Sequence, residues 1–375
     1  MALLGLFLIP LFVTVVAFFT TQGRVTWKEA LLQLGVGCLV LAGAYELAKW
    51  GAMRDTEHLN GRITGKPSGT QSCCHCRTVC DSRDKKGNCT SSHEVCSHFH
   101  DYWWSLDTTV GSISVESCSG WDSAPDVWTK ARIGEPAVVD HSYDNYLKAD
   151  PNSLFDRNAE ALTRRFTGIP KYPALYSEYK VDHVVADGQA VPAAWQDEMR
   201  ELNADLGASN QVDVTMLLTS NPEPTYAQGV EAKWLYGPKN SITVVLGVSD
   251  NGTIGWARAV TFSRVSDLKV HLRDALQGKT LSDDVPALIR PLIASEFKRT
   301  PMAQMEYLAR AATPSTGWLV GLYILGLVLS IGLTVYMAEN DVFGDESFER
   351  YRRRTTERDS FEVLDDDDDF KIPRW

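Results

Sequence analysis

Three long apolar segments limit the folds that are open to this chain. The segments are Ala2–Thr20, Ala30–Lys49 and Gly317–Ala338. The first and third hold no charged side chain, and the second is interrupted only by Gln33 and, near its end, by Glu46. A helix rises about 1.5 Å per residue, so each segment is long enough to cross a hydrocarbon core of about 30 Å. We therefore predict three transmembrane helices in preference to helices buried in a protein core.

The first segment must also be distinguished from a cleaved signal peptide. No basic residue precedes its apolar run, and Phe18-Phe19-Thr20 lacks the small residues of a typical cleavage site. We therefore predict that this segment is an uncleaved span.

Basic residues beside the apolar segments predict how the chain crosses the membrane. Arg24 and Lys28 lie in the short loop between the first two segments, and a cluster of arginines follows the third segment. Loops rich in Lys and Arg remain on the cytoplasmic side. We predict an integral protein of the bacterial inner membrane, with the N-terminus and residues 51–315 outside the cytoplasm and the C-terminus inside. The arginine cluster consists of Arg350, Arg352, Arg353 and Arg354.

The charge balance of the chain bears on its partners. The sequence has 37 Lys and Arg against 48 Asp and Glu residues, a net charge of −11. General nucleic-acid-binding proteins usually carry an excess of basic residues, so this class is excluded. The predicted partners are the lipid bilayer and another protein of unspecified kind, and no nucleic acid.

Seven of the eight cysteines lie between positions 73 and 118, and Cys38 lies in the second apolar segment. Four histidines are interleaved with them, and the spacings Cys76 to Cys80 and Cys96 to His100 suit a zinc site. Disulfides fit the predicted extracytoplasmic position better, and three bridges would leave one thiol over. Disulfides, a metal site and a mixture of both remain open. The outer cysteines are Cys73, Cys74, Cys76, Cys80, Cys89, Cys96 and Cys118, and the histidines are His75, His93, His98 and His100.

The polar middle of the chain divides by composition into two parts, which gives the predicted fold class of an α+β membrane protein. Gly51–Ser72 is rich in Gly, Thr and Pro and is predicted to be a linker, and Tyr102–Val115 is predicted to form one or two strands. The predicted parts are two transmembrane helices (1–50), a Cys-rich and Trp-rich β-containing module (51–180), an α/β module (181–312), a third transmembrane helix (317–338) and a charged tail (339–375).

Helical and strand patterns alternate in the α/β module. Pro192–Leu206 is predicted to be a helix, with Gly207 placed just past its end. Apolar, β-branched runs predict buried strands, and Asp250-Asn251-Gly252 predicts a hairpin turn. Together these elements predict a sheet covered by helices. The predicted strands are Val212–Thr219, Ser241–Val248 and Thr253–Thr261, and the further helices are Pro224–Trp234, Val265–Leu276 and Asp283–Ala311.

A family resemblance rests on four passages that follow one another along this module: VDHVVADGQAVPAAWQDEMRELNADLG, VDVTMLL, YAQGVEAKWLYG and NSITVVLGVSDNGTIGWARAV. In this order they resemble the TPM domain, the α/β module of thylakoid-phosphatase-like and related envelope proteins. The passage from Ala227 through Trp234 to Gly237 and Asn240 carries most of the resemblance. A helix and then a membrane span after the domain also follow the layout of that family. The resemblance covers residues 181–276 and implies a TPM-like fold there.

The resemblance further implies a carboxylate site, because some members of the family bind calcium or hydrolyse phosphate esters with clustered carboxylates. The positions that correspond in this chain are Asp182, Asp187 and Asp250, and oxygen ligands of this kind suit Ca²⁺. The chain departs from the family where Lys239-Asn240-Ser241 replaces Asp-Asn-Gly, and where a Gly-x-Gly turn is missing around 249–261. Because of these departures, solvated carboxylates are favoured over a metal site.

Two functions follow from these patterns. The favoured one is a non-enzymatic, membrane-anchored envelope protein whose ectodomain is an interaction or scaffold domain. The alternative is a TPM-type, metal-dependent phosphatase with its ion at Asp182 and Asp250. The sequence has no recognisable Ser-His-Asp, Cys-His or Gly-rich phosphate-binding pattern. No cofactor is expected, and Ca²⁺ and Zn²⁺ are the ions that the residues would suit. The layout also fits a protein encoded by a phage or another mobile element.

The tail combines a basic cluster near the membrane with the run Asp365–Asp369. Separated blocks of like charge repel themselves and stay solvated, so we predict a disordered interaction segment. The residues predicted to meet a cytoplasmic partner are Phe370 and Trp375.

Overall fold

The computed structural model describes residues 2–21, 25–146, 148–149, 159–234, 240–263, 265–340 and 342. The chain separates into two compact units. The first contains the apolar helices α1 (Ala2–Thr20), α2 (Trp27–Met53) and α9 (Thr316–Glu339). The second contains Arg54–Lys148 and Asn152–Tyr307 and holds the strands. The fold is therefore α+β, as predicted.

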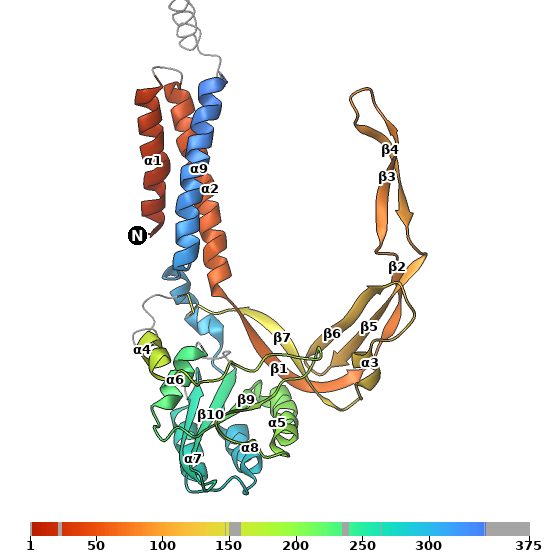
Figure 1. Cartoon of the computed structure of the whole chain (residues 1–375), viewed down its shortest axis with the longest axis vertical. Helices are drawn as coiled ribbons and strands as arrows, with labels where there is room; N and C mark the ends of the chain where they lie inside the picture. The colour runs from red at the N-terminus through yellow and green to blue at the C-terminus, as the bar shows by residue number, and fades with distance from the viewer. Residues whose placement is uncertain are drawn as a thin grey trace, which may run out of the picture. The chain divides into compact units, whose positions relative to one another are not determined.

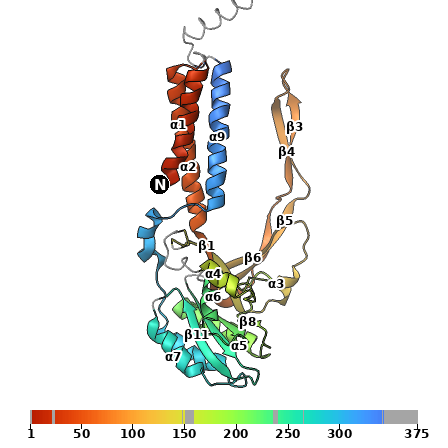
Figure 2. The same cartoon turned by 60° about the vertical axis from the view of Figure 1, so that its left-hand side comes forward.

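The three helices of the first unit pack side by side, and each is long and apolar enough to cross a membrane (Figures 1 and 2). Helix α2 begins at a capping box, in which the backbone N–H of Thr26 donates to Glu29 Oε2 over 2.8 Å. Gln33 Nε2 of α2 donates to the Ser330 carbonyl over 3.0 Å and to Thr334 Oγ1 over 2.8 Å, so this polar side chain links α2 to α9 inside the bundle. Three candidate membrane-spanning helices are thus present where the sequence predicts them.

A five-stranded sheet begins directly after α2. Its strands are β1 (Arg54–Gly65), β2 (Ser68–Ser72), β5 (His100–Thr108), β6 (Gly111–Ser119) and β7 (Pro136–Asp144). They lie in the order β2-β5-β1-β7, with β6 also paired to β5, and every pair is antiparallel. Ile63, Leu106 and Tyr179 lie in its core, beside the short helix α3 (Asp126–Lys130).

The prediction that Gly51–Ser72 is a linker is wrong, because most of this segment forms β1 and β2. Three polar residues of this segment, Glu57, His58 and Asn60, are buried in the folded protein. Glu57 accepts two hydrogen bonds from Arg299, at 2.8 and 2.9 Å, and the carbonyl of His58 accepts one from Asn240 over 2.8 Å. This polar segment can form a strand because distant parts of the chain supply hydrogen-bond partners for its buried side chains and backbone.

A four-stranded sheet forms the α/β part, in the order β11-β10-β9-β8. Strands β8 and β10 run parallel to β9, and β11 forms an antiparallel hairpin with β10, as the Asp-Asn-Gly turn predicts. The strands are β8 (Val184–Asp187), β9 (Asp213–Thr219), β10 (Ser241–Val248) and β11 (Ile254–Thr261). The helices are α4 (Ala159–Arg165), α5 (Trp195–Asn210), α6 (Tyr226–Lys233), α7 (Ser266–Leu276) and α8 (Val285–Glu296), followed by η2 (Met302–Arg310).

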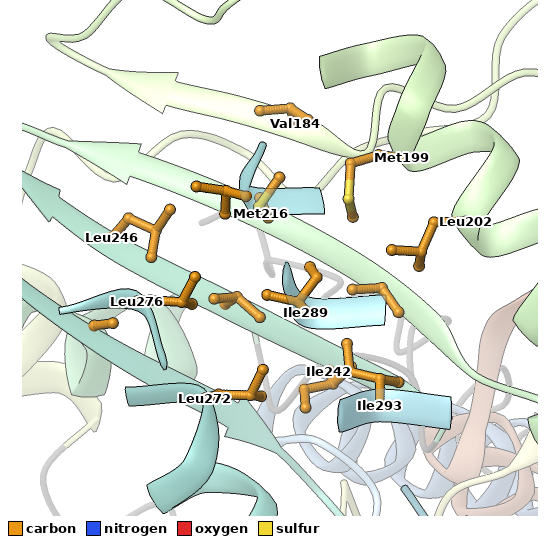
Figure 3. Packing of buried hydrophobic residues seen from close by; sticks show 14 of the residues in the cluster. Val184, Met199, Leu202, Met216, Ile242, Leu246, Leu272, Leu276, Ile289 and Ile293 are labelled. Carbon is orange, nitrogen blue, oxygen red and sulfur yellow. The ribbon is translucent and has the colours of Figure 1, made fainter. Parts of the chain in front are cut away.

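Helices cover both faces of this sheet because successive residues of a strand point to opposite sides. Met216 and Leu218 of β9 pack with α5, α7 and α8 on one face, where Figure 3 shows Met216 among the labelled side chains of these helices. Leu217 lies between them in sequence and packs on the other face with Tyr226 of α6 and with Phe166. A strand that is buried on both faces is largely apolar, which explains why Val212–Thr219 was recognisable: only Asp213 and two threonines interrupt it.

The two sheets belong to the same compact unit, and α5 packs against β1. Gly207 of α5 lies so close to β1 that a Cβ atom there would be 2.2 Å from the carbonyl oxygen of Asn60. The sequence predicts a boundary near residue 181 between two modules that fold separately. That division stays a prediction.

Candidate functional site: a disulfide-braced hairpin

Strands β3 (Cys76–Arg83) and β4 (Cys89–Cys96) form an antiparallel hairpin that is a sheet of its own (Figure 1). The turn between them is ordered by Asp84, whose Oδ1 accepts the backbone N–H groups of Lys86 and Asn88, each over 2.8 Å. Gly87 follows with a φ of +87°, a conformation that glycine adopts without steric cost. The local sequence therefore specifies this turn.

Three disulfides hold the hairpin and its base. Cys76–Cys96 and Cys80–Cys89 join β3 to β4, and Cys74–Cys118 joins the segment before β3 to β6. The disulfide interpretation of the cysteines therefore describes six of the seven outer cysteines. Cys73 keeps a free thiol, as does Cys38 in α2. The sequence had left the connectivity open, because spacing does not show which strands lie opposite each other.

The hairpin has almost no apolar core. Every residue of β4 is exposed, and no other described helix or strand packs extensively against either strand. An isolated pair of strands is only marginally stable in water. A disulfide such as Cys76–Cys96, which closes a loop with a sequence separation of 20, contributes about 3 kcal/mol. The covalent bonds therefore keep an exposed strand pair in shape without burying it.

Two aromatic side chains are exposed at the base of the hairpin. Phe99 is 100% exposed and Trp121 is 79% exposed. They lie in the same area, because their neighbours in sequence, His98 and Gly120, are in contact. A Cβ atom added at Gly120 would lie only 3.1 Å from Cε1 of His98. Of the other tryptophans near this module, Trp104 is buried and Trp128 packs on the core of the five-stranded sheet. Exposed aromatic groups of this kind are typical of protein interfaces.

The three carboxylates that the TPM resemblance implied lie at different places. Asp182 precedes β8 and accepts hydrogen bonds from Arg200, over 2.7 Å, and from Tyr176, over 2.9 Å. Asp250 lies in the exposed turn after β10. Since β8 and β10 both run parallel to β9, Asp182 lies at the amino ends of these strands and Asp250 at their carboxyl ends, about 20 Å or more apart along the strands.

Asp187 ends β8 and accepts a hydrogen bond from Tyr226 over 2.7 Å. Within the described part of the chain, no group of three or more close metal-ligand atoms includes Asp182, Asp187 or Asp250. The structure therefore does not bring these carboxylates together, and their role in metal binding stays a prediction. The tail residues Phe370 and Trp375 lie outside the described residues.

A buried polar network, which the sequence analysis missed, surrounds Asp213 at the start of β9. Asn60 donates to Asp213 Oδ1 over 2.8 Å, and Tyr172 donates to Asp213 Oδ2 over 2.9 Å. His58 Nδ1 lies 3.7 Å from Oδ2, and His183 Nδ1 lies 3.6 Å from Oδ1. The network joins β1 to the α/β sheet. The only sign of this network in the sequence was Asp213 itself, a charged residue at the start of an otherwise uncharged strand.

The pKa values of this network show that its central charge is compensated. Burial would raise the pKa of Asp213, but the neighbouring His58 reverses this effect and holds the pKa well below its usual range. Burial lowers the pKa of His183 to about 4, so that this side chain is neutral at pH 7. Burial would also lower the pKa of His58, but Asp213 raises it overall. An ionised aspartate held by hydrogen bonds and one histidine is a structural arrangement.

A cavity of 240 Å³ lies beside this network, between β1, β7 and α5. Its charged lining residues are already paired: Arg200 with Asp197 at 2.9 Å, and Lys180 with Glu135 at 3.0 Å. Such internal pairing leaves little net charge to select a ligand. The hairpin is therefore the stronger candidate for a functional surface.

In comparisons with known proteins, no protein-family model, curated protein or solved structure matches the chain.

Proposed function

We propose that the protein is a membrane-anchored envelope protein whose extracytoplasmic domain binds another protein through the β3–β4 hairpin and its base. The observation that carries the proposal is that two disulfides brace a strand pair whose side chains are almost all exposed. Such bonds add nothing to a core. They do preserve a defined surface, which lowers the entropy cost of binding.

The hairpin offers two means of binding a protein. Among the described strands, β3 pairs only with β4, so both outer edges have free backbone groups that an extended segment of a partner can pair with. Phe99 and Trp121 at the base add apolar area that becomes favourable once it is covered. The three candidate membrane-spanning helices anchor this surface beside a bilayer.

Site-specific photocrosslinking in the native membrane tests the proposal. A photoreactive amino acid in place of Thr90 in β4, or of Phe99, should form a crosslink to one partner protein. The same amino acid in place of Val270, which is exposed on α7, should not. The double variant Cys80→Ser/Cys89→Ser should weaken the crosslink at Thr90, because it loosens the end of the hairpin. Crosslinks at Val270 alone, or at all three positions equally, would contradict the proposal.

The orientation is the second expectation. The basic residues Arg24 and Lys28 in the first loop, and the cluster Arg350 to Arg354 in the tail, support a cytoplasmic position for the loop and the tail. Disulfides persist in oxidising compartments, which supports an extracytoplasmic position for the hairpin. Alkaline phosphatase fused after residue 150 should therefore be active, and a fluorescent protein fused to the C-terminus should fluoresce in the cytoplasm. An inactive phosphatase fusion, together with free thiols at Cys76 and Cys96, would show that the orientation is reversed.

A further inference from the structure

Four side chains that are able to bind a metal ion meet beside the base of the hairpin. They are Cys73, His75, His98 and Asp101, and their ligand atoms all lie within 4.8 Å of one another. Cys73 and His75 lie between β2 and β3, whereas His98 and Asp101 lie at the start of β5 or just before it. The disulfide Cys76–Cys96 links these two segments, and the N–H of Ser97 also donates to the carbonyl of His75 over 3.3 Å. The four ligands are thus brought together by the covalent frame.

The spacing within the cluster matches that of ligands around one small ion. His75 Nδ1 lies 3.3 Å from Asp101 Oδ1, and His98 Nε2 is hydrogen-bonded to the same oxygen. The two imidazole rings have centroids 5.2 Å apart. Two ligand atoms that each lie about 2.0 Å from a tetrahedral Zn²⁺ ion are about 3.3 Å from each other. Only small side-chain movements are needed to receive an ion.

Further hydrogen bonds orient the ligands. The second carboxylate oxygen of Asp101 accepts the backbone N–H of Cys74 over 2.5 Å. His98 Nδ1 lies 3.2 Å from the hydroxyl of Ser97, which in turn donates to the carbonyl of His75 over 3.3 Å. In metal sites the ring nitrogen that does not bind the ion usually has such a partner. Nδ1 of His98 is therefore engaged, and Nε2 faces the other ligands.

Charge and thiol chemistry agree with this arrangement. The side chain of Asp101 is fully buried, and the ion-pair partners described for it are the imidazoles of His75 and His98. A buried carboxylate is costly unless a positive charge compensates it, and a bound metal ion supplies that charge. Cys73 is the one outer cysteine outside the three disulfides of the described chain, and a thiolate is a good ligand for Zn²⁺.

We propose that Cys73, His75, His98 and Asp101 bind one divalent transition-metal ion, best matched by Zn²⁺, beside the three disulfides. A thiolate and two imidazoles favour Zn²⁺ over Ca²⁺, which takes oxygen ligands. Four protein ligands fill a tetrahedral shell, so the ion fixes the base of the hairpin and does not activate a water molecule. The site does not depend on the protein-binding function proposed above, because its geometry is internal to the chain.

Metal analysis of the full-length protein in detergent tests the site. Protein treated with EDTA and reloaded with Zn²⁺ should hold one ion per chain, and Co²⁺ in its place should give a thiolate charge-transfer band. Cys73→Ser should abolish that band, and Cys73→Ser and His98→Ala should each lower the Zn²⁺ affinity by more than about 100-fold. His93→Ala is the matched control, since His93 lies in the same hairpin but pairs with Asp81, and it should leave the affinity unchanged.

Thiol alkylation gives an independent measurement that holds even if a variant folds poorly. Bound Zn²⁺ should slow the alkylation of Cys73 in the wild-type protein, and EDTA should restore it, whereas Cys38 in α2 should react equally in both states. Asp101→Asn should reduce the protection, with peptide mapping used to confirm that the three disulfides are intact. Equal alkylation of Cys73 with and without Zn²⁺, unchanged Zn²⁺ binding in Cys73→Ser and His98→Ala, or a native disulfide from Cys73 to a second chain would overturn the proposal.

Discussion

Replacing Asp213 with alanine should lower the free energy of unfolding of the second unit by about 3–5 kcal/mol, the usual cost of removing one partner from a buried ion pair. The substitution leaves the donors of buried Asn60 and of partly buried Tyr172 without their acceptor. It also removes the charge that stabilises protonated His58. Each donor that loses its acceptor keeps the cost of its desolvation.

Thermal unfolding of the full-length protein in detergent, followed by tryptophan near-UV circular dichroism, measures this effect. A loss of this size corresponds to a decrease of about 10 °C in the midpoint for a unit of this length. Asp213→Asn keeps the shape and one acceptor, and should fall between Asp213→Ala and the wild type. Asp250→Ala is the matched control, because Asp250 is exposed in a turn, and it should change stability by no more than about 0.5 kcal/mol. Similar midpoints for Asp213→Ala and Asp250→Ala would show that the network contributes nothing.

Gly207→Ala should destabilise the protein although alanine is the better helix former. In an exposed helix, replacing glycine with alanine would raise the free energy of unfolding by about 1 kcal/mol. Here the new Cβ would lie 2.2 Å from the carbonyl oxygen of Asn60 and 2.7 Å from the carbonyl carbon. These are backbone atoms of β1, so relief requires α5 and β1 to separate. Overpacking typically costs about 1–3 kcal/mol, and a backbone clash belongs at the upper end. We expect a net loss of about 2 kcal/mol.

The neighbouring residue supplies the control for this experiment. Ala208 is exposed on the same helix, and Ala208→Gly should cost about 1 kcal/mol through helix propensity alone. Hydrogen exchange of β1 and α5 should show faster opening in Gly207→Ala but not in Ala208→Gly. If Gly207→Ala raises the unfolding midpoint, then the close approach of α5 to β1 is not present in solution.

Gly207 also shows where a sequence pattern was misleading. A glycine after an apolar helical run predicts the end of a helix, and we expected the helix to end at Leu206. In the structure α5 continues to Asn210 and ends with Gln211 in the left-handed region, at a φ of +52°. The glycine is inside the helix because β1 passes against it, and β1 lies more than a hundred residues away in sequence. Local signals alone do not distinguish these two causes.

The same limit applies to the candidate site. The sequence favoured disulfides over a metal site for the outer cysteines, with one thiol left over if three bridges form, and it also singled out the histidines among them. Which thiol stays free depends on the register of β3 and β4, which pairs Cys76 with Cys96. The Cys76–Cys96 pair also holds the segment with His75 close to the segment with His98 and Asp101. Asp101 itself was not singled out, because a single aspartate at the start of a strand has no spacing pattern.

The sequence by itself determined the features that depend on near neighbours: the three apolar helices, the apolar strands β9 and β10, and the turn that joins β10 to β11. These follow from the length of an apolar run, from burial on both faces of a sheet and from turn chemistry, all of which act over a few residues. Only the tertiary structure decided that the polar segment Arg54–Gly65 is a strand, that Asp213 is buried with two histidines, and that Cys73, His75, His98 and Asp101 meet. A polar residue is stable in a buried place only when its partners are there, and those partners come from distant segments that the fold brings together.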